Sequence, residues 1–199
     1  GTYSSLIWGE SAYANYQTDS NTVGLWHLDE ILGSGAYLMD SSGRGNNGTP
    51  TTASYTSSGK ISGGRAFTAT NNYVNVGSSS TFGGLTSFTL EAWIYPTTVS
   101  GEHRIFDRGS SGSPNTILLY QSGANLSLLV NNADSVTASN VLSANQWYHV
   151  VAVYVGNTSK ELYVNGVKMG SGTATQASPT AGSIATWIGC VSWTTCSSY

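Results

Sequence analysis

The chain has few charged residues and no long apolar runs, and both shortages exclude classes of protein. Of 199 residues only 9% are charged, and the seven lysines and arginines are scattered rather than clustered. Proteins that bind nucleic acids or anionic membranes neutralise phosphates with clustered basic side chains. No apolar run approaches the roughly 18 residues of a membrane-spanning helix. The sequence therefore predicts neither nucleic acid binding nor membrane insertion.

Cysteine is also scarce, since the chain has two, Cys190 and Cys196, five residues apart near its end. A structural zinc site would need a second pair of ligands nearby. We expect these cysteines to form a disulfide that closes a small loop and contributes about 2 kcal/mol to stability. Disulfides persist in oxidising compartments, so this expectation favours an extracellular protein. Two free cysteines in a reducing compartment are the alternative.

Glycine, serine, threonine and asparagine are abundant, and the apolar residues between them alternate as in β-strands. The clearest segment is Trp147–Met169. A β-branched strand over Tyr148–Val155 is followed by a polar break and by a second strand over Glu161–Val164. The dipeptide Asn165-Gly166 then predicts a tight hairpin, because both residues tolerate positive φ. Three consecutive antiparallel strands are expected here.

The same alternation predicts further strands elsewhere, ten to twelve in all, with no sustained helical period. They are Val23–Leu28, Tyr73–Val76, Phe88–Tyr95, Arg104–Asp107, Thr116–Tyr120, Leu126–Val130 and Ala185–Ile188. This number of short strands is typical of an all-β, two-sheet antiparallel sandwich. We assign residues 23–199 to one domain and residues 1–22 to an N-terminal extension or lead-in strand. Residues 33–52 read as a long loop.

Six motifs in order resemble one family: GLWHLDE, DSSGRGNNGT, AFTATNNYVNVG, SFTLEAWIYP, RIFDRGS and WYHVVAVYVGNTSKELYVNGV. The chain resembles, over roughly residues 23–188, the laminin G-like domains of the concanavalin A-like lectin/glucanase superfamily, in its bacterial and archaeal branch. The resemblance implies a jelly-roll sandwich that serves as a binding module on secreted or cell-surface proteins, often with a structural calcium ion.

The chain departs from that family at its end. Such domains close with a strand of the type Gly-x-Ile-Asp-Glu-Val, which is missing before Tyr199. An unpaired sheet edge invites pairing with another chain. One hypothesis is therefore that a neighbouring subunit completes the sheet, with residues 1–22 as a candidate donor.

A calcium site is expected in the loop around Asp40. The segment Asp40–Gly48 is rich in carboxylate, amide and carbonyl oxygens, which are the ligands that Ca²⁺ prefers. By resemblance the ligands would be Asp40, carbonyls near Gly45 and Asn46, and Glu30. In the alternative interpretation, Asp40 caps its own turn.

The acidic residues do not form a catalytic pattern. Glycosidases need two carboxylates that flank one bond, usually on one face of a strand. Glu91 is alone on its strand, and Glu102 and Asp107 are separated by five positions across Arg104. We predict no enzyme activity and keep a glycoside hydrolase only as a remote alternative. His149 is expected to be structural, with its ring bonded to backbone.

Six tryptophans and twelve tyrosines supply rings on which sugars stack. Trp26, Trp93 and Trp147 lie in or beside predicted strands and are expected in the core. The candidate ligand contacts lie at strand ends and in loops: Tyr120, Gln121, Asn131, Asn132 and Trp193.

The favoured function is non-catalytic extracellular recognition of a polysaccharide or glycan, with a protein partner at the cell surface as another ligand. The alternative is a structural subunit or adhesin module of a surface appendage or filament.

Overall fold

A computed structural model describes residues 18–69, 72–109 and 116–189, and nearly all of its regular structure is β-strand. The strands are β1 (Thr49–Thr51), β2 (Ser54–Thr56), β3 (Gly64–Ala66), β4 (Tyr73–Ser79), β5 (Ser87–Ile94), β6 (Glu102–Arg108), β7 (Ile117–Ser122), β8 (Asn125–Val130), β9 (Asp134–Ala138), β10 (Tyr148–Val155), β11 (Ser159–Val164), β12 (Val167–Gly172) and β13 (Ile184–Gly189). One 3₁₀ turn, η1 (Ser80–Phe82), follows β4. No helix among the described residues is long and apolar enough to cross a membrane.

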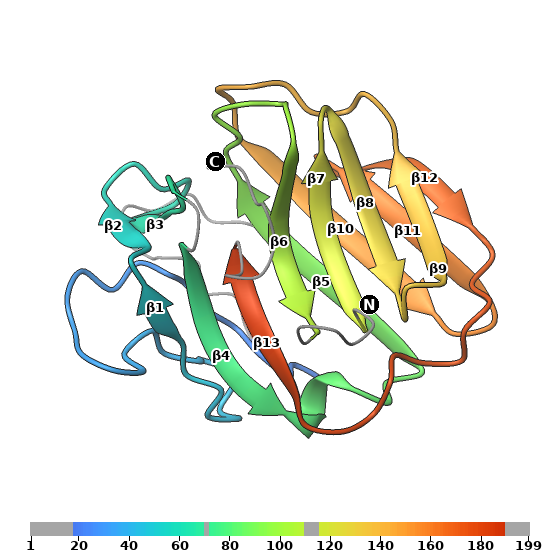
Figure 1. The fold of residues 1–199 in the computed structure, drawn as a ribbon, viewed down its shortest axis with the longest axis horizontal. Helices are drawn as coiled ribbons and strands as arrows, with labels where there is room; N and C mark the ends of the chain where they lie inside the picture. Colours follow the sequence, from blue (N-terminus) through green and yellow to red (C-terminus); the bar gives the residue numbers. More distant parts are fainter. Residues whose placement is uncertain (1–17, 70–71, 110–115, 190–199) are drawn as a thin grey trace, which may run out of the picture.

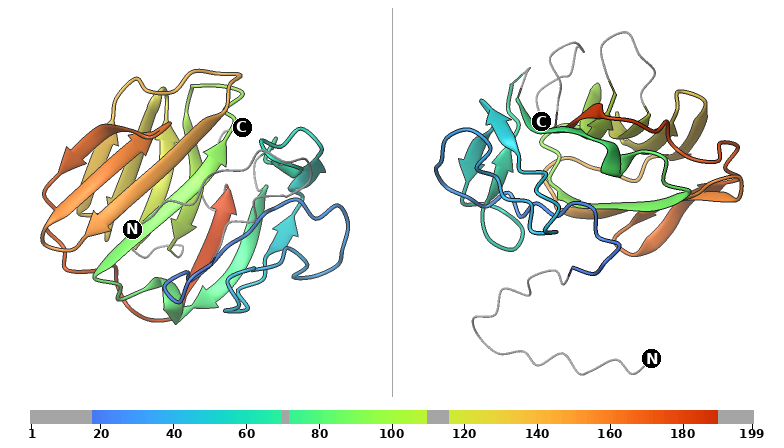
Figure 2. Two further views of the ribbon diagram at one scale, coloured as in Figure 1. Left: turned by 180° about the vertical axis from the view of Figure 1, so that it is seen from behind. Right: turned by 90° about the horizontal axis from the view of Figure 1, so that it is seen from below.

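Two antiparallel sheets lie face to face (Figure 1). The larger has seven strands in the order β1-β4-β13-β6-β7-β8-β9, and the smaller has four in the order β12-β11-β10-β5. Figure 2 shows the smaller sheet from its outer side on the left and the layers from below on the right. The predicted all-β antiparallel sandwich is confirmed. A short pair, β2 and β3, stands apart from both sheets at one end of the molecule (Figure 1).

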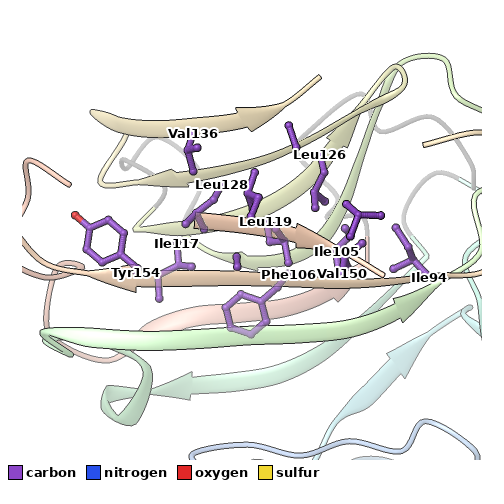
Figure 3. Packing of buried hydrophobic residues seen from close by; sticks show 14 of the residues in the cluster. Ile94, Ile105, Phe106, Ile117, Leu119, Leu126, Leu128, Val136, Val150 and Tyr154 are labelled. Carbon is purple, nitrogen blue, oxygen red and sulfur yellow. The ribbon is translucent and has the colours of Figure 1, made fainter. Parts of the chain in front are cut away.

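The core fills the space between the sheets because inward side chains alternate with outward ones on each strand. Its main cluster joins residues of both layers, such as Leu119 and Leu128 from the larger sheet and Val150 and Leu162 from the smaller (Figure 3 labels the first three). A second cluster lies under β4 and comprises Leu38, Val74, Val76 and Phe82.

The hairpin segment has the predicted form. β10 runs from Tyr148 to Val155 as expected, and Asn165 and Gly166 have φ values of 50° and 80° between β11 and β12. A second turn of this kind joins β8 to β9, where Asn131 and Asn132 have φ values of 53° and 54°. Neither β9 nor this turn was predicted from the sequence, because the two asparagines resembled ligand contacts.

The prediction of a strand over Val23–Leu28 is wrong. Within that stretch the structure has a single bridge, between Trp26 and Asp40, and no continuous ladder. Leu28 has a φ of 62°, far from the negative φ of extended backbone, so the extended segment stops there. The expected long loop is shorter than predicted, since it contains a bridge between Leu38 and Gly48 and ends in β1.

β13 occupies the interior of the larger sheet and pairs with β4 on one side and β6 on the other. The chain reaches it by a crossover, residues 173–183, that passes from the smaller sheet to the larger. Cys190, Cys196 and most of the N-terminal extension, residues 1–17, lie outside the described residues. The disulfide and the donated strand therefore stay predictions.

Candidate functional site

β5 and β10 present an outward face that differs sharply from the inward one. Phe88, Leu90, Ala92 and Ile94 point to the core. The residues between them, including Glu91 and Trp93, point away from it, and Trp93 lies opposite His149 in the ladder. The outer face of the smaller sheet therefore carries large and ionisable side chains.

Four rings gather at the end of this face where β5 finishes and β10 begins. We call Trp93, Tyr95, Trp147 and His149 the aromatic quartet. The Trp93 and His149 ring centroids are 5.1 Å apart, and those of Tyr95 and Trp147 are 5.4 Å apart. Trp93 remains 43% exposed and Tyr95 40% exposed. Large rings with so much exposed surface are typical of binding sites.

Charged groups border the quartet on two sides. Lys60, from the turn between β2 and β3, places its Nζ over the Trp93 ring, 5.0 Å from the centroid. On the sheet side, the Glu91 carboxylate lies 2.8 Å from His149 Nε2. The site thus combines apolar ring faces with a cation beside Trp93 and a carboxylate beside His149.

This arrangement suits binding rather than bond cleavage. The Glu91 carboxylate faces the His149 imidazole, whereas a glycosidase pairs two carboxylates across one bond. Within residues 18–69, 72–109 and 116–189 no cluster of His, Cys, Asp or Glu is suited to hold a metal ion. Exposed rings beside hydrogen-bonding groups can stack on the apolar face of a ligand and orient its polar groups.

The expectation that Trp93 lies in the core is wrong, and Trp147 is half-buried just before β10. Trp26 agrees better, since it packs on the second cluster and donates from Nε1 to Asn46 O at 2.8 Å. His149 bonds a carboxylate instead of the expected backbone groups. The alternation of β5 carried the signal, because Trp93 falls on the face opposite Phe88 and Leu90.

The predicted ligand contacts do not converge. Tyr120 is half-buried on the outer face of the larger sheet, in register with Arg104. Its neighbour Gln121 is fully buried on the inner face, where its Nε2 donates to Thr98 O at 2.8 Å. Gln121 cannot reach a surface ligand, so the prediction that it contacts the ligand is wrong. Trp193 lies outside the described residues.

Asn131 and Asn132 belong to the turn between β8 and β9. Asn131 is a structural residue that holds the crossover: its Nδ2 donates to Ser178 O at 2.9 Å, and its Oδ1 accepts from Thr180 N at 2.9 Å. These contacts occupy both polar atoms of the side chain, so Asn131 is committed to the fold.

The Asp40 loop is held by hydrogen bonds. Oδ1 of Asp40 accepts from the backbone N–H groups of Leu25 and Ser42 at 3.0 and 2.9 Å, and Oδ2 accepts from Asn46 N at 2.9 Å. The bond from Ser42 N to Asp40 Oδ1 is the turn cap that the alternative interpretation of Asp40 predicted. Although partial burial opposes it, hydrogen bonding to this carboxylate lowers the pKa of Asp40.

The same contacts test whether calcium fits. N–H dipoles surround the Asp40 carboxylate, where a Ca²⁺ shell would need oxygen atoms. Asn46 O accepts from Trp26 Nε1, and Glu30 Oε1 accepts from Met39 N at 2.7 Å. Gly45 has a φ of 76° and serves the turn. These hydrogen bonds satisfy the Asp40 turn itself, whereas Glu30 Oε2 is buried without a hydrogen-bond partner among the described residues. Calcium binding therefore stays a prediction.

Replacing Asp40 with alanine is expected to lower the free energy of unfolding by about 2 kcal/mol, because three backbone donors lose a charged acceptor. For a domain of this size the melting temperature should fall by about 4–8 °C. Calorimetry with and without a chelator separates the two interpretations. If chelation leaves the melting temperature unchanged, the calcium hypothesis is rejected. An Asp40→Ala variant as stable as the native chain would contradict the capping role.

The remaining acidic pair is also unsuited to catalysis. Arg104 lies between the two carboxylates, in an ion pair with Asp107 and 3.3 Å from Glu102. Burial raises the pKa of Asp107, although Arg104 acts in the opposite direction. The carboxylates therefore share one guanidinium instead of flanking an open space.

Comparison with solved structures finds several chains with a similar fold. The chain is similar to the binding domain of Paraclostridial Mosquitocidal Protein 1, with 14% identity and a TM-score of 0.57 over 78% of this chain and 46% of that one. It is similar to domain 4 of AbnA, a GH43 extracellular arabinanase from Geobacillus stearothermophilus, in complex with arabinotriose, with 21% identity and a TM-score of 0.57 over 78% and 79% of the two chains.

A third similar structure is that of botulinum neurotoxin type C, whose cell entry depends on interaction with two ganglioside molecules. Identity is 15% and the TM-score is 0.52, over 76% of this chain and 40% of that one. The chain thus spans less than half of the two toxin chains. At these identities the likeness concerns the fold alone.

No curated protein matches the sequence. The Laminin_G_3 family model, described as the concanavalin A-like lectin/glucanases superfamily, matches residues 68–198, which is more than half of the chain. The chain belongs to this family.

Proposed function

We propose that the protein is a non-catalytic carbohydrate-binding module whose ligand docks on the aromatic quartet. The observation that carries this proposal is the exposure of Trp93 and Tyr95 at the end of β5, on the outer side of the smaller sheet. The arabinotriose and ganglioside named for two similar structures support a glycan as the class of ligand.

The binding mechanism follows from the chemistry of the site. Pyranose and furanose rings have an apolar C–H face, which gains contact area and loses unfavourable hydration when it covers an indole or phenol ring. The hydroxyl groups at the ring edge would then meet Lys60 and Glu91, which donate and accept hydrogen bonds respectively. The site is built on strands, so binding requires little ordering of the protein.

The proposal places the module outside the cell and assigns it no catalytic residue. Glu102 and Asp107 both contact the Arg104 guanidinium, and Glu91 is hydrogen-bonded to His149. Neither arrangement supports acid–base hydrolysis. Calcium has no role in this mechanism.

Replacing Trp93 with alanine is expected to weaken sugar binding at least tenfold, equivalent to about 1.4 kcal/mol, because the most exposed tryptophan of the quartet is lost. A glycan array identifies the ligands of the native chain, and titration calorimetry with the best of them gives the change. Trp93→Phe, which keeps a ring, should lose less.

Tyr120→Ala is the matched control, since it removes a ring from the outer face of the other sheet. If Tyr120→Ala abolishes binding while Trp93→Ala retains it, the ligand occupies the larger sheet. If the native chain binds no sugar on the array, the carbohydrate proposal fails.

The structural-subunit alternative has one observation in its favour. Among the described strands, β5 pairs only with β10, so eight residues of sheet edge face no described neighbour. Such an edge can accept a strand from another chain. The molar mass in solution tests this alternative, because a monomer at high concentration would exclude strand exchange between subunits.

A further inference from the structure

We propose that the aromatic quartet selects sugars that carry a carboxylate, such as uronic or sialic acids, and that Lys60 recognises this group. The inference rests on the proposed carbohydrate function. Its basis is the contact between the Lys60 ammonium and the exposed Trp93 ring, at 5.0 Å from the centroid.

The position of Lys60 penalises a neutral ligand. A sugar that stacks on the face of Trp93 next to Lys60 displaces the ammonium, and the cation–π attraction is then lost. A neutral sugar offers only dipoles in return. A carboxylate at the edge of the sugar instead pairs with the displaced ammonium, so the positive charge keeps a partner throughout binding.

Lys60 is also available to a ligand. It is exposed, and no described carboxylate lies within ion-pair distance of its Nζ. The lysines of the smaller sheet already have partners: Lys160 is buried in an ion pair with Asp134, and Lys168 lies 3.0 Å from Glu161. Lys60 is therefore suited to attract an anion.

The charges around the quartet give the ligand one orientation. Glu91 lies two residues before Trp93 on the same face and is held by His149 at 2.8 Å. Like charges repel, so a ligand carboxylate is favoured beside Lys60 over a position beside Glu91.

Matched pairs of probes test the selectivity: trigalacturonate against its methyl ester, and sialyllactose against its methyl ester. The native chain should bind the acid of at least one pair about fivefold more tightly than its neutral partner at low salt. The pair that shows this preference distinguishes uronic from sialic acids. The difference should shrink in 0.5 M NaCl, because salt screens exposed charges.

The variants Lys60→Gln, Lys168→Gln and Trp93→Ala separate this inference from the proposed function. Lys60→Gln should equalise the acid and its neutral partner. Lys168→Gln removes the same net charge from a lysine that already has a carboxylate partner, Glu161, and should preserve the preference.

Acid and neutral probes that bind the native chain equally would overturn the selectivity. An unchanged preference in Lys60→Gln would also overturn it. In both cases the carbohydrate function would stand, provided that Trp93→Ala weakens every probe that binds. If Trp93→Ala weakens none, or if no probe binds, both proposals fail.

Discussion

Replacing Asp134 with alanine is expected to lower the free energy of unfolding by about 3–5 kcal/mol, because the change leaves the buried charge of Lys160 without its partner. Asp134 is 1% exposed, and its Oδ1 forms an ion pair with Lys160 across the core. Its Oδ2 accepts from Tyr154 Oη at 2.8 Å and from the backbone of Thr175 at 2.6 Å. One carboxylate therefore joins β9, β10, β11 and the start of the crossover.

Urea unfolding followed by tryptophan fluorescence measures this loss. The matched control is Lys168→Gln, which breaks the more exposed pair between Lys168 and Glu161 on the same sheet. Exposed pairs contribute about 0–1 kcal/mol, so the control should stay close to the native chain. Equal effects of the two changes would contradict the structural role of Asp134.

The same residue makes stability depend on pH. Although burial opposes it, hydrogen bonds from Lys160, Thr175 and Tyr154 lower the pKa of Asp134 from 3.8 to about 2. Because the folded-state value is the lower one, the stabilisation is complete above about pH 4 and is lost as the pH falls toward 2. The loss amounts to about 2 kcal/mol.

Asp40, whose pKa is also lowered, acts in the same direction. Asp107, whose pKa is raised by burial, acts oppositely, since the folded state takes up its proton more readily as the pH falls. Unfolding measured between pH 2 and 6 should show a shallower acid slope in Asp134→Asn than in the native chain. A parallel slope would contradict this assignment.

Replacing Arg108 with methionine is expected to cost about 3–4 kcal/mol. Arg108 is fully buried and donates to Thr180 O at 2.8 Å, to Gly182 O at 2.7 Å and to the Thr116 hydroxyl at 2.5 Å. Methionine matches the length of the side chain but leaves these acceptors unsatisfied. Arg108→Lys should not restore stability, because an ammonium lacks the planar fork that reaches separate acceptors.

Calorimetry measures the loss, and hydrogen exchange shows where it falls. The end of the crossover should open, so the Gly84 amide, which donates to Pro179 O at 3.0 Å, should exchange faster. Arg44→Met is the control, since Arg44 is exposed and donates to Ser20 O on the surface. Unchanged protection at Gly84 in Arg108→Met would show that the crossover does not depend on this guanidinium.

Much of the sandwich could be predicted because strand periodicity is local. In β5 every second residue is apolar, β10 is a run of β-branched and aromatic residues, and both strands have nearly the predicted bounds. The turn at Asn165-Gly166 was equally readable, since its two residues meet a backbone requirement within the turn itself. The predicted strand over Val23–Leu28 was wrong for an equally local reason, because Leu28 adopts a positive φ that apolar patterning does not reveal.

The candidate site was predicted poorly because it depends on contacts between distant segments. Trp93 was readable as outward-facing, but tryptophan is apolar enough to pass for a core residue. Nothing near Lys60 in the sequence shows that the turn between β2 and β3 folds over β5. Asn131 resembled a ligand contact until its side chain met the crossover 47 residues later.

The alternation of apolar side chains along the chain was sufficient to specify two facing sheets and the residues that fill the space between them. That pattern acts over neighbouring residues, where covalent geometry sets which face each side chain takes. Only the tertiary structure placed β13 between β4 and β6. It also brought Lys60 to Trp93 and anchored the crossover through Asp134 and Arg108. Such contacts form only when the whole chain has packed, because the partners are far apart in sequence and share no local signal.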